Sequence, residues 1–108
     1  MKLNDYQQQA AASAIYPRDM KAVYPALGLA GETGEVAEKV KKVIRDHGGN
    51  FSEDAKTEIA KELGDVLWYL AAMAGDLGFT LEQIAEMNLQ KLASRKSRGQ
   101  LHGSGDNR

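Results

Sequence analysis

The sequence predicts an all-α protein, a small antiparallel four-helix bundle-like domain of a size that gains stability by oligomerising. Apolar residues recur at spacings of three and four in the segments 29–44 and 59–73, which is typical of buried helix faces. Glycines follow both segments, at Gly48 and Gly78, where helices commonly end. No segment shows the alternation of apolar and polar residues that indicates a β-strand.

The first predicted helix begins at Asn4. Asn4 and Gln7 have the spacing of a capping box, in which side chains bind the free backbone amides at a helix start. The helix is expected to run to about Ile15, because Pro17 disfavours helical geometry in the residue before it. The segment from Pro17 to Pro25 is then expected to be a loop.

The second predicted helix runs from about Pro25 to Gly48. Proline suits the first turn of a helix, and glycine is common just after the last turn. Two glycines inside this helix, Gly31 and Gly34, each cost about 1 kcal/mol relative to alanine. We therefore expect them to allow the close approach of a neighbouring helix or of a ligand.

Two further helices and a tail complete the chain. Ser52 is the predicted N-cap of the third helix, which is expected to run to about Leu77. Thr80 and Gln83 form a second capping-box pattern and predict the start of the fourth helix. Residues 99–108 contain three glycines and no apolar periodicity. We therefore predict one domain over residues 1–98 and a flexible C-terminal tail over residues 99–108.

The composition of the 108 residues excludes several kinds of site and partner. A formal net charge of −1 does not match a nucleic acid backbone, so no nucleic acid polymer is expected as a partner. No apolar run approaches the roughly 20 residues of a membrane span. The absence of cysteine excludes disulfides and thiolate metal ligands, and we expect a cytoplasmic protein.

Two pairs of acidic residues are the best candidates for a functional site. Glu32 and Glu35 form one pair, Glu62 and Asp65 form the other, and each pair has a spacing that places both side chains on one helix face. Packed face to face, the two helices would bring four like charges together, which favours a bound cation. No histidine lies at helical spacing from them, and an oxygen-only site suits Mg²⁺ or Mn²⁺. The alternative interpretation is an ordinary solvated helix face.

The spacing of these pairs resembles a known metal signature. Glu32-x-x-Glu35, then 26 residues, then Glu62-x-x-Asp65 is similar to the motif of the MazG-like nucleoside triphosphate pyrophosphohydrolases. These enzymes belong to the all-α NTP pyrophosphatase superfamily, which includes the dimeric dUTPases. Five stretches of the chain share the resemblance: residues 16–17, 28–36, 62–69, 88–95 and 101–108.

The resemblance implies an enzyme of nucleotide pool house-cleaning that splits an NTP or dNTP into a monophosphate and pyrophosphate. Glu32, Glu35, Glu62 and Asp65 would be the Mg²⁺ ligands, with Mn²⁺ as a possible substitute. Bound metal would neutralise the triphosphate and activate a water for attack at the α-phosphorus. Glu35 or Glu38 would orient or deprotonate that water, although Glu38 is equally well explained as a surface partner of a nearby lysine. The resemblance also implies a homodimer or homotetramer.

Cationic side chains are the expected contacts for the substrate phosphates. The resemblance assigns this role to Asn88, Lys91 and Arg95 in the fourth helix, whose alternative role is an ordinary solvated helix face. Lys39, Lys42 and Arg45 in the second helix are weaker candidates, because such residues are common on any helix surface.

Aromatic residues near the second acidic pair are candidates for contact with the base. Tyr69 follows Asp65 by one helical turn and is the better candidate, while Trp68 is expected to be a core residue. The tail, residues 99–108, has an alternative role in which it folds over a bound nucleotide.

Two alternatives to a general pyrophosphohydrolase are open. The first has the same chemistry with a narrow substrate range, as in a dUTPase, a dCTPase or an enzyme that hydrolyses guanosine tetraphosphate-type alarmones. The second is a non-enzymatic helical adaptor whose carboxylates form a solvated or partner-binding face.

Overall fold

The computed structural model describes residues 1–108 and contains helices as its only regular structure. The helices are α1 (Leu3–Ala11), the short 3₁₀ helix η1 (Arg18–Met20), α2 (Val23–His47), α3 (Glu53–Asp76) and α4 (Leu81–Ser97). No strand is present, so the predicted all-α class is confirmed. None of the helices is both long enough and apolar enough to span a membrane.

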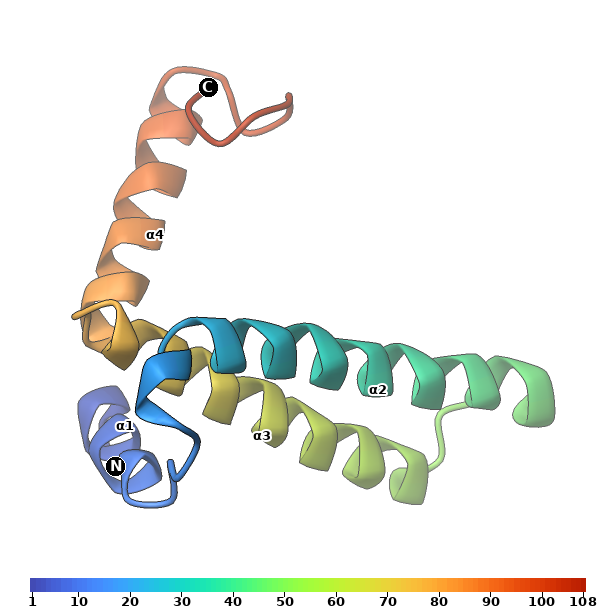
Figure 1. Ribbon diagram of the computed structural model, residues 1–108. Helices are drawn as coiled ribbons and strands as arrows, with labels where there is room; N and C mark the ends of the chain where they lie inside the picture. The colour runs from blue at the N-terminus through green and yellow to red at the C-terminus, as the bar shows by residue number, and fades with distance from the viewer.

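Helices α2 and α3 form a long antiparallel hairpin (Figure 1). Gly48 ends α2 in the left-handed conformation, with a φ of 59°, and Ser52 caps α3 by accepting a hydrogen bond from the backbone amide of Ala55 at 3.1 Å. Both predictions are therefore confirmed. The start of α2 lies two residues before Pro25, which occupies the first turn, where its missing amide has no intrahelical partner to lose.

Helix α1 is shorter than predicted and begins differently. It starts at Leu3 and ends at Ala11, four residues before Ile15. The predicted N-cap role of Asn4 is wrong, because the chain is already helical one residue earlier. Lys2 is the N-cap residue, and its backbone amide donates to the carboxylate of Asp5 at 3.2 Å.

The side chains of Asn4 and Gln7 instead join α1 to α3, to the start of α4 and to the turn between them. Asn4 Oδ1 accepts from the backbone amide of Glu82 at 3.0 Å, and Gln7 Oε1 accepts from that of Leu81 at 2.9 Å. Gln7 Nε2 donates to the carbonyl oxygens of Ala71 and Phe79. Two of the amides left free at the start of α4 are therefore satisfied from a different helix.

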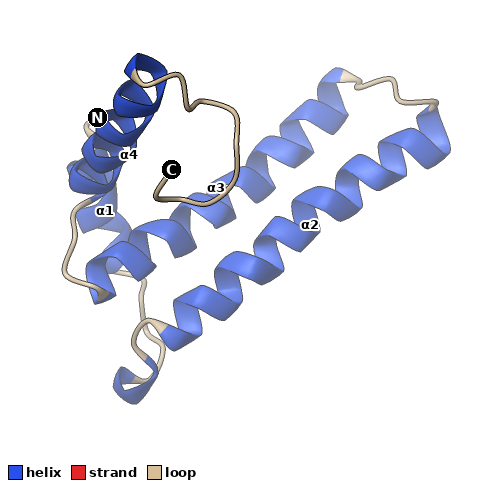
Figure 2. Cartoon of the chain, turned by 90° about the horizontal axis from the view of Figure 1, so that it is seen from above, coloured by secondary structure: helices blue, strands red, loops and turns tan.

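Helix α4 leaves the hairpin at the end of α3. Thr80 and Gln83 form the predicted capping box, in which each side chain accepts from the backbone amide of the other residue. Only the start of α4 packs on the other helices, where Leu81 joins Ala71 and Ala74 in the small core, and the rest extends away from the hairpin (Figures 1 and 2). The radius of gyration is 16.7 Å, which exceeds the roughly 13 Å expected for a compact chain of this length.

The glycine that permits close approach is Gly28. A Cβ atom at Gly28 would lie 2.1 Å from the ring of Tyr69, so α2 can pack on this ring only because residue 28 has no side chain. A Cβ atom at Gly31 or Gly34 would meet no atom within 4 Å. No helix of this chain therefore packs against these two glycines, and the alternative, that they allow the approach of a ligand, stays a prediction.

Candidate active site

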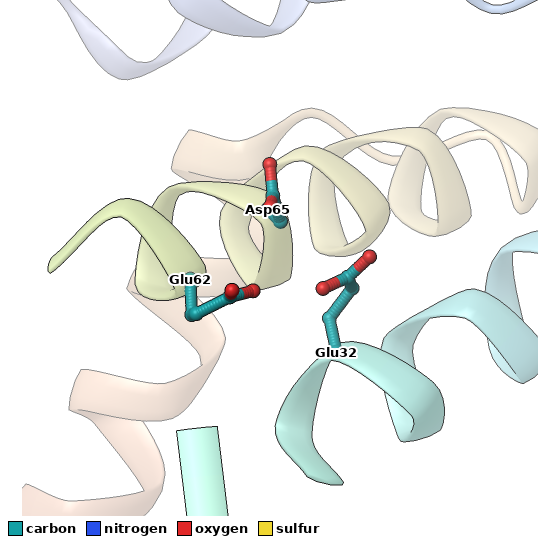
Figure 3. A group of neighbouring side chains, drawn as sticks. All are labelled: Glu32, Glu62 and Asp65. Carbon is teal, nitrogen blue, oxygen red and sulfur yellow. The ribbon is translucent and has the colours of Figure 1, made fainter. Parts of the chain in front are cut away.

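Three of the four predicted ligands meet at the middle of the hairpin. Glu32 projects from α2 toward Glu62 and Asp65 on α3, as Figure 3 shows. One carboxylate oxygen from each residue can be chosen so that all three lie within 4.8 Å of one another. Because α2 and α3 are antiparallel and packed along one face, each contributes its carboxylates at the same level of the hairpin. The three oxygens form a group that could hold a metal ion.

The charges of this group repel one another, and Glu32 shows the effect. Burial and the neighbouring charge of Asp65 raise the pKa of Glu32 above its usual value of 4.5, and a hydrogen bond shared with Glu62 raises the pKa further. The raised pKa means that the negative charge of Glu32 has no positively charged partner nearby to stabilise it. A cation among the three oxygens would supply that partner.

Glu35 and Glu38 lie outside the three-carboxylate group. Glu35 is exposed on α2, and it affects the group through the repulsion between its charge and that of Glu32. Glu38 forms an ion pair with Lys41, at 2.8 Å, and the hydrogen bond from Lys41 lowers the pKa of Glu38. The lysine pairing that the sequence offered as an alternative for Glu38 is present.

One lysine reaches the group from α2. Lys39 Nζ lies 3.5 Å from Glu62 Oε1 and 3.8 Å from Glu58 Oε2. The side chains of Lys39 and Glu62 are 31% and 18% exposed, so this ion pair is shielded from solvent more than the other lysine pairs of the hairpin. Lys39 was a weaker candidate by sequence, although it follows Glu32 by seven residues and therefore lies on the same face of α2.

An aromatic cavity adjoins the carboxylates. Its volume is about 400 Å³, and it is lined by Ser13, Glu32, Asp65, Trp68 and Tyr69. The rings of Trp68 and Tyr69 are nearly perpendicular, at 85°, with centroids 5.0 Å apart, and Trp68 Nε1 donates to Ser13 Oγ at 3.0 Å. Trp68 therefore lines this cavity and is only half-buried, whereas the sequence predicted a core residue.

The loop between α1 and α2 extends the aromatic wall. Tyr16 stacks on Tyr24 with ring centroids 5.0 Å apart, and Tyr24 packs against Tyr69. Asp76 fixes this loop by accepting hydrogen bonds from the Tyr16 hydroxyl at 2.7 Å and from the Ala22 backbone amide at 2.8 Å. Burial, with the hydrogen bond to Asp76, raises the pKa of Tyr16 to about 12. Sequence reasoning missed this wall, because no local pattern in the loop indicates which helix it contacts.

Lys42 lies near a second cavity between α2 and α3. This cavity, of about 440 Å³, is also lined by Lys39, Asp46, His47 and Glu58. Lys42 is exposed and forms no ion pair. It is therefore free to contact an anion.

The predicted phosphate contacts of α4 do not join the carboxylates within one chain. Asn88 faces the hairpin, where it lines a cavity with Leu67 and Leu70 of α3. Lys91 and Arg95 follow it in the second half of α4, which extends away from the hairpin (Figure 1). Lys91 Nζ and Arg95 Nη2 both bind Asp106 Oδ1 of the tail, at 2.6 Å and 3.1 Å. The two cations lower the pKa of Asp106. In this structure the α4 cations hold the tail.

Comparison with known proteins identifies the family. Residues 25–99 match the MazG nucleotide pyrophosphohydrolase domain, and this range contains both acidic pairs. The chain is also 44% identical, over 100% of both sequences, to the Gene 37 protein of Mycobacterium phage L5. No solved structure matches the chain significantly. The chain therefore belongs to the MazG nucleotide pyrophosphohydrolase family, which is the family that its acidic motif resembles.

Proposed function

We propose that this protein hydrolyses a nucleoside or deoxynucleoside triphosphate to the monophosphate and pyrophosphate, with Mg²⁺ as the cofactor and nucleotide pool house-cleaning as the role. The observation that carries the proposal is the convergence of Glu32, Glu62 and Asp65 beside an aromatic cavity, within a chain of this family. The carboxylates provide a place for metal and phosphate, and the cavity provides a place for a base.

The donor set fits a hard divalent cation. Glu32, Glu62 and Asp65 offer only oxygen, which Mg²⁺ and Mn²⁺ prefer, and the raised pKa of Glu32 indicates unbalanced negative charge at this point. When bound, such a cation would supply positive charge to the triphosphate and acidify the attacking water. The chain's own residues must then align the substrate and accept the proton of that water.

Glu35 is a better candidate than Glu38 for the residue that orients or deprotonates the attacking water. Glu38 is paired with Lys41, which lowers its pKa and makes it a weaker proton acceptor. Glu35 has no ion-pair partner and lies one turn from Glu32 on the same helix. We assign it to a fourth metal ligand position or to the orientation of the attacking water.

The base of the nucleotide is expected to contact Tyr69 and Trp68. Both rings line the cavity that Glu32 and Asp65 also line, so a triphosphate held at the carboxylates would place its nucleoside beside these rings. Stacking on an aromatic face is favourable for every base, which fits a broad substrate range. A dUTPase, dCTPase or alarmone hydrolase remains the alternative with narrow specificity.

The remaining phosphate contacts are proposed to come from α2 and from α4. Lys42 is free of ion pairs and follows Lys39 on α2. The α4 residues Asn88, Lys91 and Arg95 would reach a carboxylate group most readily in a second copy of the chain, and a homodimer or homotetramer is therefore part of the proposal. The exposed apolar residues of α4 support association, since Met87 and Leu89 are 53% and 65% exposed.

A nucleotide panel tests this function. The purified protein is incubated with the common ribonucleoside and deoxyribonucleoside triphosphates and dUTP, with Mg²⁺ or with a chelator, and pyrophosphate is measured. We expect pyrophosphate from several dNTPs in Mg²⁺ only. Release from a single nucleotide would support the narrow enzyme. Release from none, with a melting temperature that Mg²⁺ and nucleotide do not change, would support a non-enzymatic adaptor.

A further inference from the structure

Lys39 is the cationic side chain that forms an ion pair with the three-carboxylate group of Glu32, Glu62 and Asp65. Its ammonium lies 3.5 Å from Glu62 Oε1, and no other lysine or arginine forms an ion pair with Glu32, Glu62 or Asp65. The pair joins α2 to α3, because Lys39 and Glu62 belong to opposite helices of the hairpin.

The position of Lys39 conflicts with a metal ion at the same carboxylates. A divalent cation held by Glu62 would draw on the same oxygen charge that Lys39 now neutralises. It would also repel the ammonium at short range, since like charges a few ångströms apart interact strongly at a partly shielded site. The lysine and the metal therefore compete for Glu62.

Once displaced from Glu62, the Lys39 ammonium would be free to contact a phosphate. Lys39 Nζ lies 3.5 Å from Glu62 Oε1, so an anion bound to a metal at Glu62 would lie next to the carboxylate that Lys39 now contacts. A phosphate carries more negative charge than one carboxylate, and a lysine is a common partner for it. The four methylene groups of the side chain allow this change of partner without movement of α2.

We propose that Lys39 has two successive partners: Glu62 in the metal-free protein, and a phosphate oxygen of the triphosphate once a divalent cation holds Glu62. The proposal rests on the function proposed above. It adds Lys39 to the phosphate contacts proposed for α2, as the lysine that already contacts the carboxylate group of its own chain.

Because Lys39 competes with the metal for Glu62 but contacts the phosphate, its loss should change the binding of metal and of triphosphate in opposite directions. Replacing Lys39 by glutamine removes a competitor of the metal, so metal alone should bind more tightly. The same change removes a phosphate contact, so a triphosphate should bind more weakly. A lysine that only held the two helices together would weaken both kinds of binding, and an ordinary surface lysine would alter neither.

The test uses the full chain and two probes. Mg²⁺ alone and inorganic tripolyphosphate at saturating Mg²⁺ are titrated by calorimetry. Tripolyphosphate carries no base, so the result does not depend on which nucleotide is preferred. Three variants are compared with the wild type: Lys39→Gln, Lys39→Arg and Lys61→Gln. Lys61 is a matched control, because its ammonium also binds Glu58, at 3.0 Å, but forms no ion pair with Glu62.

The expected results differ in sign between the two probes. Lys39→Gln is expected to bind Mg²⁺ about fivefold more tightly and tripolyphosphate about tenfold more weakly. Lys39→Arg, which keeps the charge, is expected to restore most of the tripolyphosphate affinity. Lys61→Gln is expected to stay within about twofold of the wild type for both, as is usual for an exposed ion pair.

Each contrary outcome has a distinct meaning. Equal effects of Lys39→Gln and Lys61→Gln, or weaker binding of both probes by Lys39→Gln, would overturn the role of Lys39 while leaving the proposed function intact. A wild-type protein that binds neither probe at millimolar concentration would contradict the proposed metal-dependent function, and the role of Lys39 with it.

Discussion

The guanidinium of Arg95 is buried against Asp106, which lies eleven residues further along the chain, in the tail. Arg95 Nη2 donates to the Asp106 carbonyl oxygen at 2.6 Å and to Oδ1 at 3.1 Å, and the Arg95 side chain is 7% exposed. Arg108 closes the tail on itself by donating to the carbonyl oxygens of Gln100, Leu101 and Gly105. The tail thus covers a cation that the sequence offered as a phosphate contact, and Arg95 can meet a phosphate only when Asp106 leaves.

Loss of the Asp106 carboxylate should release the tail. In Asp106→Ala the cations Lys91 and Arg95 lose their shared partner, so residues 99–108 should open more often. We expect trypsin to cleave after Arg98 several-fold faster than in the wild type, as measured by mass spectrometry of a time course. Asp19→Ala, a change on the exposed 3₁₀ helix, serves as the control. Equal cleavage of all three proteins would show that Asp106 does not fasten the tail.

A methyl group at residue 28 should be far more harmful than one at residue 31. In Gly28→Ala the new Cβ would overlap the ring of Tyr69, so the ring or the helix must move, at a cost of about 1–3 kcal/mol in the free energy of unfolding. Gly31→Ala meets no atom and should stabilise α2 by up to about 1 kcal/mol. Urea unfolding of both variants measures the difference. Similar values would contradict the close packing of α2 on Tyr69.

Gln7 should contribute more to stability than its neighbour. Gln7→Ala removes three hydrogen bonds that join α1 to α3, to the α3–α4 turn and to the start of α4, one of them to the buried residue Ala71. We expect a loss of about 1–3 kcal/mol in the free energy of unfolding, because the groups that it satisfies would be left without partners. Gln8→Ala, at an exposed site on the same helix, is the control and should change stability by less than about 0.5 kcal/mol. Equal losses of stability in the two variants would argue against this role of Gln7.

Local patterns in the sequence were reliable where both partners lie within one turn. Ser52 binds an amide three residues away, and Thr80 and Gln83 bind one another, so their spacing alone predicts the contact. Asn4 and Gln7 have the same spacing but bind groups more than sixty residues away. No local signal distinguishes the two cases.

The candidate site was predictable in part for the same reason. Helical spacing places Glu32 and Glu35 on one face, and Glu62 and Asp65 on another. The rotation of α2 against α3 decides which of the four converge, and it brings in Glu32 while leaving Glu35 outside. That rotation depends on long-range packing, including the contact of Gly28 with Tyr69, which spacing does not describe.

The stability of the metal-free protein should depend on Glu32 and on pH. The pKa of Glu32 is raised in the folded state, so the folded protein binds this proton more tightly than the unfolded chain does. The contribution of Glu32 to stability is therefore largest below pH 4.5 and is lost as the pH rises through the raised pKa. Because glutamine cannot ionise, Glu32→Gln should gain stability relative to the wild type as the pH rises through this range.

This pH effect is measured by urea unfolding in a chelator at a series of pH values from about 4 to 7. Glu86→Gln on α4 is the control, and its difference from the wild type should not follow the same curve. A Glu32→Gln difference that stays constant with pH would mean that the three carboxylates do not repel one another.

The most direct test of the central claim is the metal-dependent release of pyrophosphate by Glu62→Gln. Glu62 belongs to the three-carboxylate group, and its conversion to an amide removes a charge from the expected metal site with little change of shape. In saturating Mg²⁺, with the best nucleotide of the panel, we predict a rate at least about a hundredfold below that of the wild type. The matched control Glu86→Gln is predicted to stay within about twofold of it. A Glu62→Gln rate equal to that of the wild type, or a wild-type rate that a chelator does not change, would contradict the account.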